Sequence, residues 1–124
     1  MSAFCILAAP LVSRGQGLVR ADLFRSIETV AIVDAYSSGR LLPEKFQERG
    51  VEVIHVQSEK EIVDPYFANT FRPDSFAVNI INGGSLNSLY QTVGQSRAQA
   101  VLAGSETGLL LADKLTHHLD LRGN

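Results

Sequence analysis

The sequence lacks most features of disulfide-rich, metal-binding and nucleic-acid-binding proteins. Its 124 residues include one cysteine, Cys5, so an internal disulfide is excluded. The three histidines, at positions 55, 117 and 118, do not have the spacing of zinc ligands. The net charge is −2, from 11 basic and 13 acidic residues, and the basic residues are scattered. Such a chain has no electrostatic footprint for nucleic acid or an acidic membrane.

The sequence also lacks an apolar run that could cross a bilayer. The run from Phe4 to Val12 is too short for a membrane span. It has neither the basic residues before it nor the small-residue cleavage site after it that a signal peptide needs. We therefore expect a cytoplasmic protein with no membrane partner. Residues 1–26 are expected to form an N-terminal arm or an edge strand.

The remaining sequence alternates apolar strands with amphipathic helices, which is typical of a parallel sheet covered on both faces. A hydrophobic content of 45% is enough for one domain with a buried core. Gly50 is placed to end the first helix. Residues 57–75 are predicted to form a long loop with at most a short helix. The predicted strands cover 29–35, 51–56, 76–81 and 100–103, and the predicted helices cover about 38–49, 86–95 and 106–119.

Three polar loops follow these strands, at residues 34–39, 82–85 and 104–107. Open parallel sheets bind ligands beyond the carboxyl ends of their strands, where these loops are expected to lie. Gly104 allows a sharp turn, and Ser105 can cap the next helix, whose N-terminus would suit a carboxylate or phosphate. The alternative is that glycine and serine occur there only because turns and helix caps prefer them.

Two nucleotide-related sites are disfavoured by the sequence. The turn after the first strand lacks the Gly-x-Gly-x-x-Gly pattern, and Gln57 and Ser58 stand where a dinucleotide-binding strand ends in an acid. Asp34 follows the first strand, as in phosphoryl-accepting domains. Such a site also needs a second acid beside it, an acid after the third strand and a late lysine. Asn82 and Glu106 occupy those last two positions.

Several short segments stand in an order and spacing found in a known family. They are Ile32-Val33-Asp34-Ala35-Tyr36-Ser37-Ser38-Gly39-Arg40, Leu42-Pro43, Phe46, Gly50, Val101-Leu102-Ala103-Gly104-Ser105-Glu106-Thr107-Gly108, Ala112-Asp113-Lys114-Leu115 and Leu121-Arg122-Gly123-Asn124. Together, over about residues 27 to 124, they resemble the N-terminal domain of ATP-grasp carboxylate-amine ligases. The subgroup they resemble is the amino-acid ligases that make dipeptides and related amides.

This resemblance implies a three-layer Rossmann-like domain of the pre-ATP-grasp type at residues 27–124, with a mainly parallel sheet of about four or five strands. It implies a ligase that activates a carboxylate as an acyl phosphate for attack by an amine. In the family, ATP and magnesium bind to domains that follow a Gly-Asn like Gly123-Asn124, and these 124 residues do not include them. The chain alone is expected to bind no cofactor and to be inactive. Its expected partners are the remaining ATP-grasp domains, a small-molecule amino acid or carboxylate, and a second copy of the chain in a homo-oligomer.

The resemblance further implies six substrate-binding candidates and no catalytic residue. Glu106 is expected to orient a substrate ammonium group, although a glutamate in the first turn also complements the helix dipole. The six candidates are Ser37, Ser38, Gly39, Gly104, Ser105 and Glu106.

Two interpretations of function remain open on the sequence. The first is the substrate-side domain of an ATP-dependent ligase. The second is a free-standing small-molecule-binding or regulatory module without catalysis. His55 is expected to be a hydrogen-bonded, partly buried histidine of the second strand, while His117 and His118 are expected to have no metal role.

Overall fold

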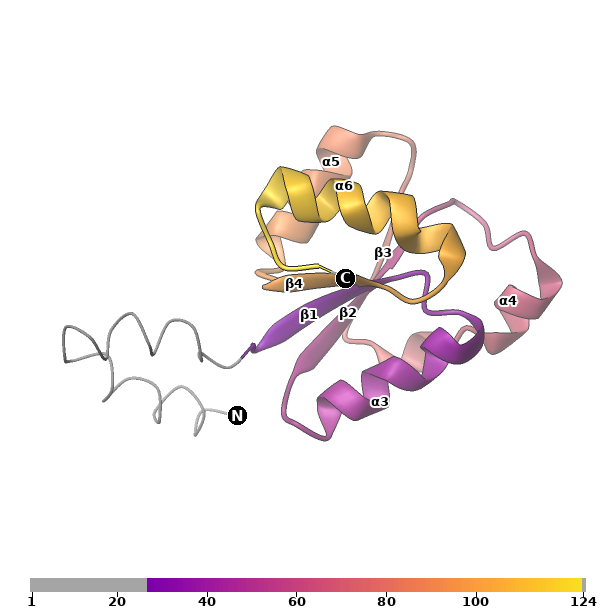
Figure 1. Cartoon of the computed structure of the whole chain (residues 1–124). Helices are drawn as coiled ribbons and strands as arrows, with labels where there is room; N and C mark the ends of the chain where they lie inside the picture. The colour runs from indigo at the N-terminus through magenta and orange to yellow at the C-terminus, as the bar shows by residue number, and fades with distance from the viewer. Residues whose placement is uncertain (1–26, 124) are drawn as a thin grey trace, which may run out of the picture.

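The structure is built around a parallel sheet of four strands (Figure 1). A computed structural model describes residues 27–123, and the predicted arm at 1–26 lies outside the described residues. The strand order is β3-β2-β1-β4, and every neighbouring pair is parallel, which confirms the α/β prediction. The strands are β1 (Thr29–Val33), β2 (Glu52–Gln57), β3 (Asn79–Ile81) and β4 (Ala100–Ala103).

The helices agree with the predicted pattern, with some shifted boundaries. The predicted first and last helices each begin with a 3-10 turn. Gly50 follows the first helix with a φ of 77°, as its predicted C′ position requires. No helix in residues 27–123 has the length and apolarity needed to cross a membrane. The α-helices are α3 (Leu42–Gln47), α4 (Pro65–Thr70), α5 (Leu86–Gln95) and α6 (Leu109–Leu119), and the 3-10 helices are η1 (Ser37–Leu41), η2 (Pro73–Ser75) and η3 (Glu106–Gly108).

Two strand predictions were too long. The first strand ends at Val33 and not at Ala35, because Asp34 has a φ of 56° and therefore leaves the extended conformation. The third strand begins at Asn79 and not at Phe76. Phe76 instead packs its ring against the ring of His55 on β2, with centroids 4.8 Å apart.

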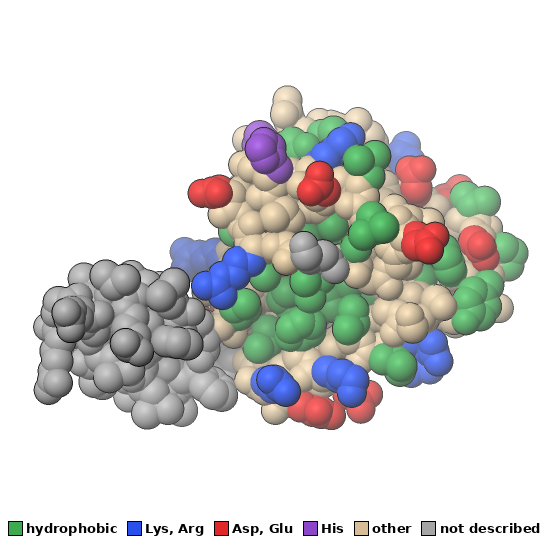
Figure 2. All heavy atoms as spheres, viewed as in Figure 1, with side chains coloured by type: hydrophobic (Ala, Val, Ile, Leu, Met, Phe, Trp, Pro, Cys, Tyr) green, Lys and Arg blue, Asp and Glu red, His purple; other side chains and the backbone are tan. Residues whose placement is uncertain are grey.

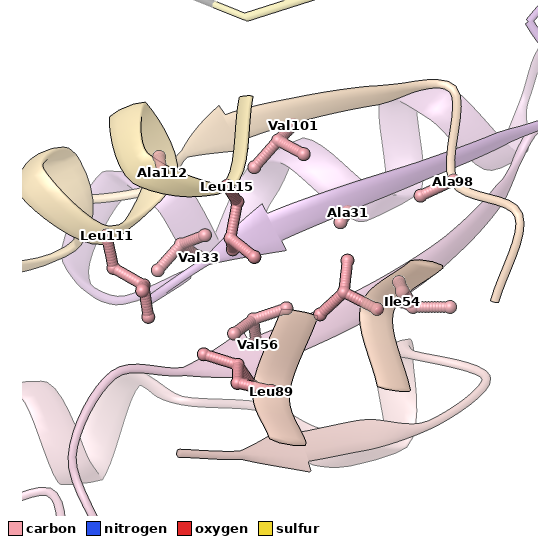
Figure 3. Packing of buried hydrophobic residues seen from close by; sticks show 11 residues of the cluster. Ala31, Val33, Ile54, Val56, Leu89, Ala98, Val101, Leu111, Ala112 and Leu115 are labelled. Atoms are coloured by element: carbon pink, nitrogen blue, oxygen red, sulfur yellow. The ribbon is translucent and has the colours of Figure 1, made fainter. Parts of the chain in front are cut away.

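The core has two layers, one on each face of the sheet. Ala31 and Val33 of β1 point toward α5 and α6, where Leu115 is fully buried (Figure 3). The alternate residues, Val30 and Ile32, belong to the second cluster on the opposite face, together with side chains of α3. Figure 2 shows apolar side chains gathered between the sheet and α3. This is the three-layer Rossmann-like arrangement.

The strand order fixes where a crevice can form. Strands β2 and β3 lie on one side of β1, and β4 lies on the other side. The chain therefore leaves β1 toward α3 and leaves β4 toward α6, on opposite faces of the sheet (Figure 1). In open α/β sheets, two neighbouring strands whose connections go to opposite faces leave a crevice between their loops at the carboxyl ends. Ligands bind in this crevice.

Candidate functional site

The loops that follow β1 and β4 touch through their backbones at two glycines. A Cβ atom on the buried Gly39 would lie 2.0 Å from the carbonyl oxygen of Gly104. A Cβ atom on Gly104 would lie 2.6 Å from the Cα of Ala35. The amide of Gly104 donates a hydrogen bond to the carbonyl of Val33 at 2.7 Å. The structure therefore brings these two predicted loops together, and only glycine fits at either position.

The Asp34 side chain joins the ends of three strands. It is 1% exposed, and one carboxylate oxygen accepts a hydrogen bond from the Ser58 amide at 2.9 Å. The other oxygen accepts from the Ser58 hydroxyl at 2.5 Å and from the Thr107 hydroxyl at 2.8 Å. The Asn82 side-chain amide donates to the Ser58 carbonyl at 3.1 Å. A single buried carboxylate thus holds the segments after β1, β2 and β4, and Asn82 ties the segment after β3 to them.

A pocket of about 520 Å³ opens above this carboxylate. Its lining residues fall into three groups, which we call the floor (a buried carboxylate and two hydroxyl side chains bonded to it), the wall (apolar and aromatic side chains) and the mouth (exposed acidic side chains). A pocket of this size at the carboxyl edge of a parallel sheet can hold a small organic molecule. The lining residues are Asp34, Ser58 and Thr107 on the floor, Tyr36, Ile62, Val63, Pro65 and Phe67 on the wall, and Glu59, Glu61 and Asp64 at the mouth.

The short helix α4 supplies part of the aromatic wall. Asp64 caps it by accepting hydrogen bonds from the amides of Tyr66, at 2.8 Å, and Phe67, at 3.3 Å. Pro65 occupies the first helical position, where its missing N–H and fixed φ are no disadvantage. The ring of Phe67 then lies 5.5 Å from the ring of Tyr36. The segment predicted as a long loop with at most a short helix therefore contains the short α-helix α4.

His55 supports the loop from below and is fully buried. Its Nε2 accepts a hydrogen bond from the Ala35 amide at 2.9 Å, so the proton of the neutral ring belongs on Nδ1, which lies 2.7 Å from Oδ1 of Asn79. Burial lowers the pKa of His55, and the Asn79 hydrogen bond and the charge of Asp34 oppose that shift. The predicted hydrogen-bonded histidine is confirmed, and its burial is complete.

Tyr36 is also buried at the edge of the pocket, with 4% of its surface exposed. Burial raises the pKa of its phenol far above the usual value, and the nearby Asp34 carboxylate raises the pKa further. Tyr36 therefore keeps its proton at neutral pH and can act as a hydrogen-bond donor.

The other predicted site residues lie beside the pocket without lining it. The Ser37 amide donates to Oγ1 of Thr70 at 2.8 Å, and Ser38 is an exposed residue within η1. Ser105 occupies the N-cap position of η3, but its side chain makes no cap hydrogen bond. The prediction that Ser105 caps the helix was therefore wrong, because its hydroxyl lies 2.9 Å from the Thr107 hydroxyl instead.

Glu106 is exposed on η3. Within residues 27–123 its carboxylate has no hydrogen bond or ion pair. The loop at 82–85 contributes to a different hollow of about 320 Å³, where Ser85 caps α5 by accepting from the Ser88 amide at 3.3 Å. The three predicted loops therefore share one edge of the sheet but not one pocket.

The sequence did not identify the three floor residues of the pocket as site residues. On the sequence alone, Asp34 is compared with a phosphoryl acceptor. Ser58 is noted only because this residue stands where a dinucleotide-binding strand would have an acid. The sequence predicts Thr107 only as the last residue of a loop. Their positions in the sequence could have identified them, because all three polar residues follow the carboxyl ends of neighbouring strands.

No metal centre is formed in the part of the chain that the structure describes. Residues 27–123 contain no group of three or more histidine, cysteine or acidic side chains placed to hold a metal ion. His118 at the end of α6 stacks on Tyr90, with ring centroids 3.9 Å apart.

Comparison with known proteins gives one informative similarity. Dapdiamide A synthase of Enterobacter agglomerans is 31% identical to this chain over 111 residues. The match covers 81% of this chain and 24% of that protein. The chain thus spans about a quarter of the length of the curated relative that it matches. No family model matches the chain.

The glycine contact predicts a specific sensitivity to added side-chain volume. We expect Gly39→Ala to lower the free energy of unfolding by about 1–3 kcal/mol or more, because its Cβ meets the Gly104 backbone, which cannot move without displacing β4. Gly83→Ala is the matched control, since no atom lies within 4 Å of a Cβ at that position. Urea unfolding measures both variants, and equal stabilities would contradict the contact.

The buried His55 predicts a pH dependence of stability. Its folded pKa lies below its ordinary value of 6.5, so the unfolded chain takes up this proton first as the pH falls. The contribution of His55 to stability is therefore fully present above about pH 6.5 and declines below it, by up to about 1.4 kcal/mol per pH unit. Urea unfolding between pH 7.5 and pH 5 should show a shallower decline for His55→Gln than for the wild type. The control His117→Gln, at an exposed position, should keep the wild-type slope.

Proposed function

We propose that residues 27–124 are the substrate-side domain of an ATP-dependent carboxylate-amine ligase of the amino-acid or dipeptide type. The observation that carries this proposal is the 31% identity to Dapdiamide A synthase over 111 residues. The motifs after β1 and β4 support it, because they resemble the N-terminal domain of ATP-grasp ligases. The parallel sheet with a pocket at its carboxyl edge is compatible with such a domain.

The proposed reaction has two steps. ATP transfers its terminal phosphoryl group to a substrate carboxylate, which gives an acyl phosphate and ADP. An amine then attacks the acyl carbon and displaces phosphate, which gives an amide. We propose that ATP and magnesium bind to the remaining ATP-grasp domains of a longer parent protein. The described residues would supply the floor of the substrate site and a surface for those domains.

The six predicted residues keep the role of substrate-site candidates in this proposal. Gly39 and Gly104 set the approach of the two loops through their backbone contact. Ser37, Ser38, Ser105 and Glu106 lie along the same edge of the sheet, and Ser38 and Glu106 are exposed there. An exposed carboxylate with no partner in residues 27–123 is available to a substrate ammonium group that a facing domain brings close.

A second candidate function is a small-molecule-binding or regulatory module that performs no catalysis. The observation that favours it is that the described residues form a pocket of about 520 Å³, with lining residues between positions 34 and 107. Such a pocket can bind a ligand without any ATP-dependent step.

The ligase proposal predicts a trappable acyl phosphate. The protein that contains these residues together with the ATP-grasp part should release ADP when given ATP, magnesium and a substrate acid. Hydroxylamine should convert the activated acid to a hydroxamate, because it attacks acyl phosphates. Residues 1–124 alone should give neither product. Release of neither ADP nor hydroxamate, across a panel of amino acids, would favour the module without catalysis.

The exposed side chains on the two loops predict a kinetic effect. In the same longer protein, Ser38→Ala and Glu106→Gln should raise the KM of the amine or lower kcat by about tenfold or more, because a contact with the reacting partners is removed. Melting temperatures should stay close to the wild type, since both residues are exposed. Glu48→Gln, at the exposed end of α3, is the control. Unchanged kinetics in both variants would remove Ser38 and Glu106 from the site.

A further inference from the structure

The pocket above Asp34 carries charge of one sign only. Four of its lining side chains are carboxylates, at Asp34, Glu59, Glu61 and Asp64, and no lysine, arginine or histidine lines it. Figure 2 shows acidic and apolar side chains side by side at the α4 end of the molecule. Asp64 is engaged as the cap of α4, whereas Glu59 and Glu61 are exposed side chains at the mouth. The electrostatic field of such a pocket favours cations and repels anions.

Asp34 adds a buried charge that the protein leaves without a cationic partner. Its hydrogen-bond donors are the Ser58 amide, the Ser58 and Thr107 hydroxyls and the Tyr36 phenol, all of them neutral. No ion pair to this carboxylate is formed within residues 27–123. A buried carboxylate is costly unless an opposite charge lies nearby, and an incoming cation would supply that charge.

The wall of the pocket is suited to an apolar group. Tyr36 and Phe67 form a pair of rings whose centroids are 5.5 Å apart, and Ile62 and Pro65 extend the apolar surface. Val63 is 86% exposed, so part of this surface is open to solvent. Aromatic faces also attract cations, which adds to the preference for positive charge.

We propose that this pocket binds a protonated amine that carries an apolar group and has no free carboxylate. The ammonium group lies toward Asp34 and the acidic mouth, and the apolar group lies against Tyr36 and Phe67. A free carboxylate on the same ligand would find no cation among the lining residues and would face the existing negative charges. The identification of this amine as a substrate rests on the proposed ligase function, whereas its binding does not.

Three probes of matched shape test the proposal on the chain of residues 1–124. Phenethylamine has the ring and the ammonium group, phenylalanine adds a carboxylate, and 3-phenylpropanoate has the ring and a carboxylate without the ammonium group. In calorimetric titrations at pH 7.5, phenethylamine should bind, phenylalanine should bind at least about tenfold more weakly, and 3-phenylpropanoate should not bind. The affinity for phenethylamine should fall as salt is added, because part of the attraction is screened.

Variants of the exposed acidic residues at the mouth of the pocket test the proposal without affecting folding. Glu59→Gln combined with Glu61→Gln removes two exposed charges and should weaken phenethylamine binding several-fold while leaving the melting temperature unchanged. The control pair Glu44→Gln with Glu48→Gln removes the same charge from α3, away from the pocket, and should bind as the wild type does. Amide chemical shifts should move for Ser58, Val63 and Thr107 when phenethylamine is added.

Three results would overturn the proposal. They are the absence of phenethylamine binding, equal affinities for phenethylamine and phenylalanine, and shift changes confined to other surfaces, such as the one around Tyr90 and His118. None of these results would bear on the acyl phosphate assay, because that assay requires only ATP-dependent activation of an acid. Loss of hydroxamate formation would likewise leave amine binding by residues 1–124 intact, so the two proposals fail separately.

Discussion

The hydrogen bonds to the Asp34 carboxylate are the interaction on which the carboxyl edge of this domain depends. Both oxygens are used, by donors in the segments after β2 and β4, and the Tyr36 phenol is hydrogen-bonded to the same carboxylate. Asp34 itself has a φ of 56°, a conformation that aspartate tolerates better than most residues. This backbone turn ends β1 and directs the carboxylate under its neighbours. The same carboxylate lines the pocket and is hydrogen-bonded to Tyr36, two residues further along the chain.

The layout of the fold was predictable because burial leaves a periodic pattern in the sequence. Strand β4 and helix α5 were predicted with their observed bounds, and Gly50 was identified as a helix terminator. The errors fall where local pattern and tertiary structure conflict. The predicted first strand runs to Ala35, which is apolar and is buried in the structure, but the positive φ of Asp34 ends the strand at Val33. A positive φ at a non-glycine residue leaves no periodic signal.

The sequence was enough to place the candidate site at the carboxyl edge of the sheet, beside the loops after β1 and β4. It was not enough to say which side chains form the pocket. Gly39 and Gly104 were singled out, and their backbones do meet. Ser58 could not be paired with Asp34 from sequence, because that pairing depends on the lateral register of β1 and β2 and on how far β2 extends. A serine just before a helix predicts a cap, yet the Ser105 hydroxyl lies beside the hydroxyl of Thr107, which donates a hydrogen bond to Asp34.

If the hydrogen bonds of Asp34 hold the segments after β1, β2 and β4 together, removing its carboxylate must destabilise those segments and leave the sheet intact. The most direct measurement is hydrogen exchange on Asp34→Gly, because glycine accepts the positive φ while losing the side-chain hydrogen bonds to Ser58 and Thr107. The predicted result is faster exchange at the Ser58 amide and through residues 104–107, with protection of the amides within β1 and β2 unchanged. Unchanged exchange at Ser58, or an equal loss of protection across the whole sheet, would contradict the assignment of Asp34 as the residue that holds these loops.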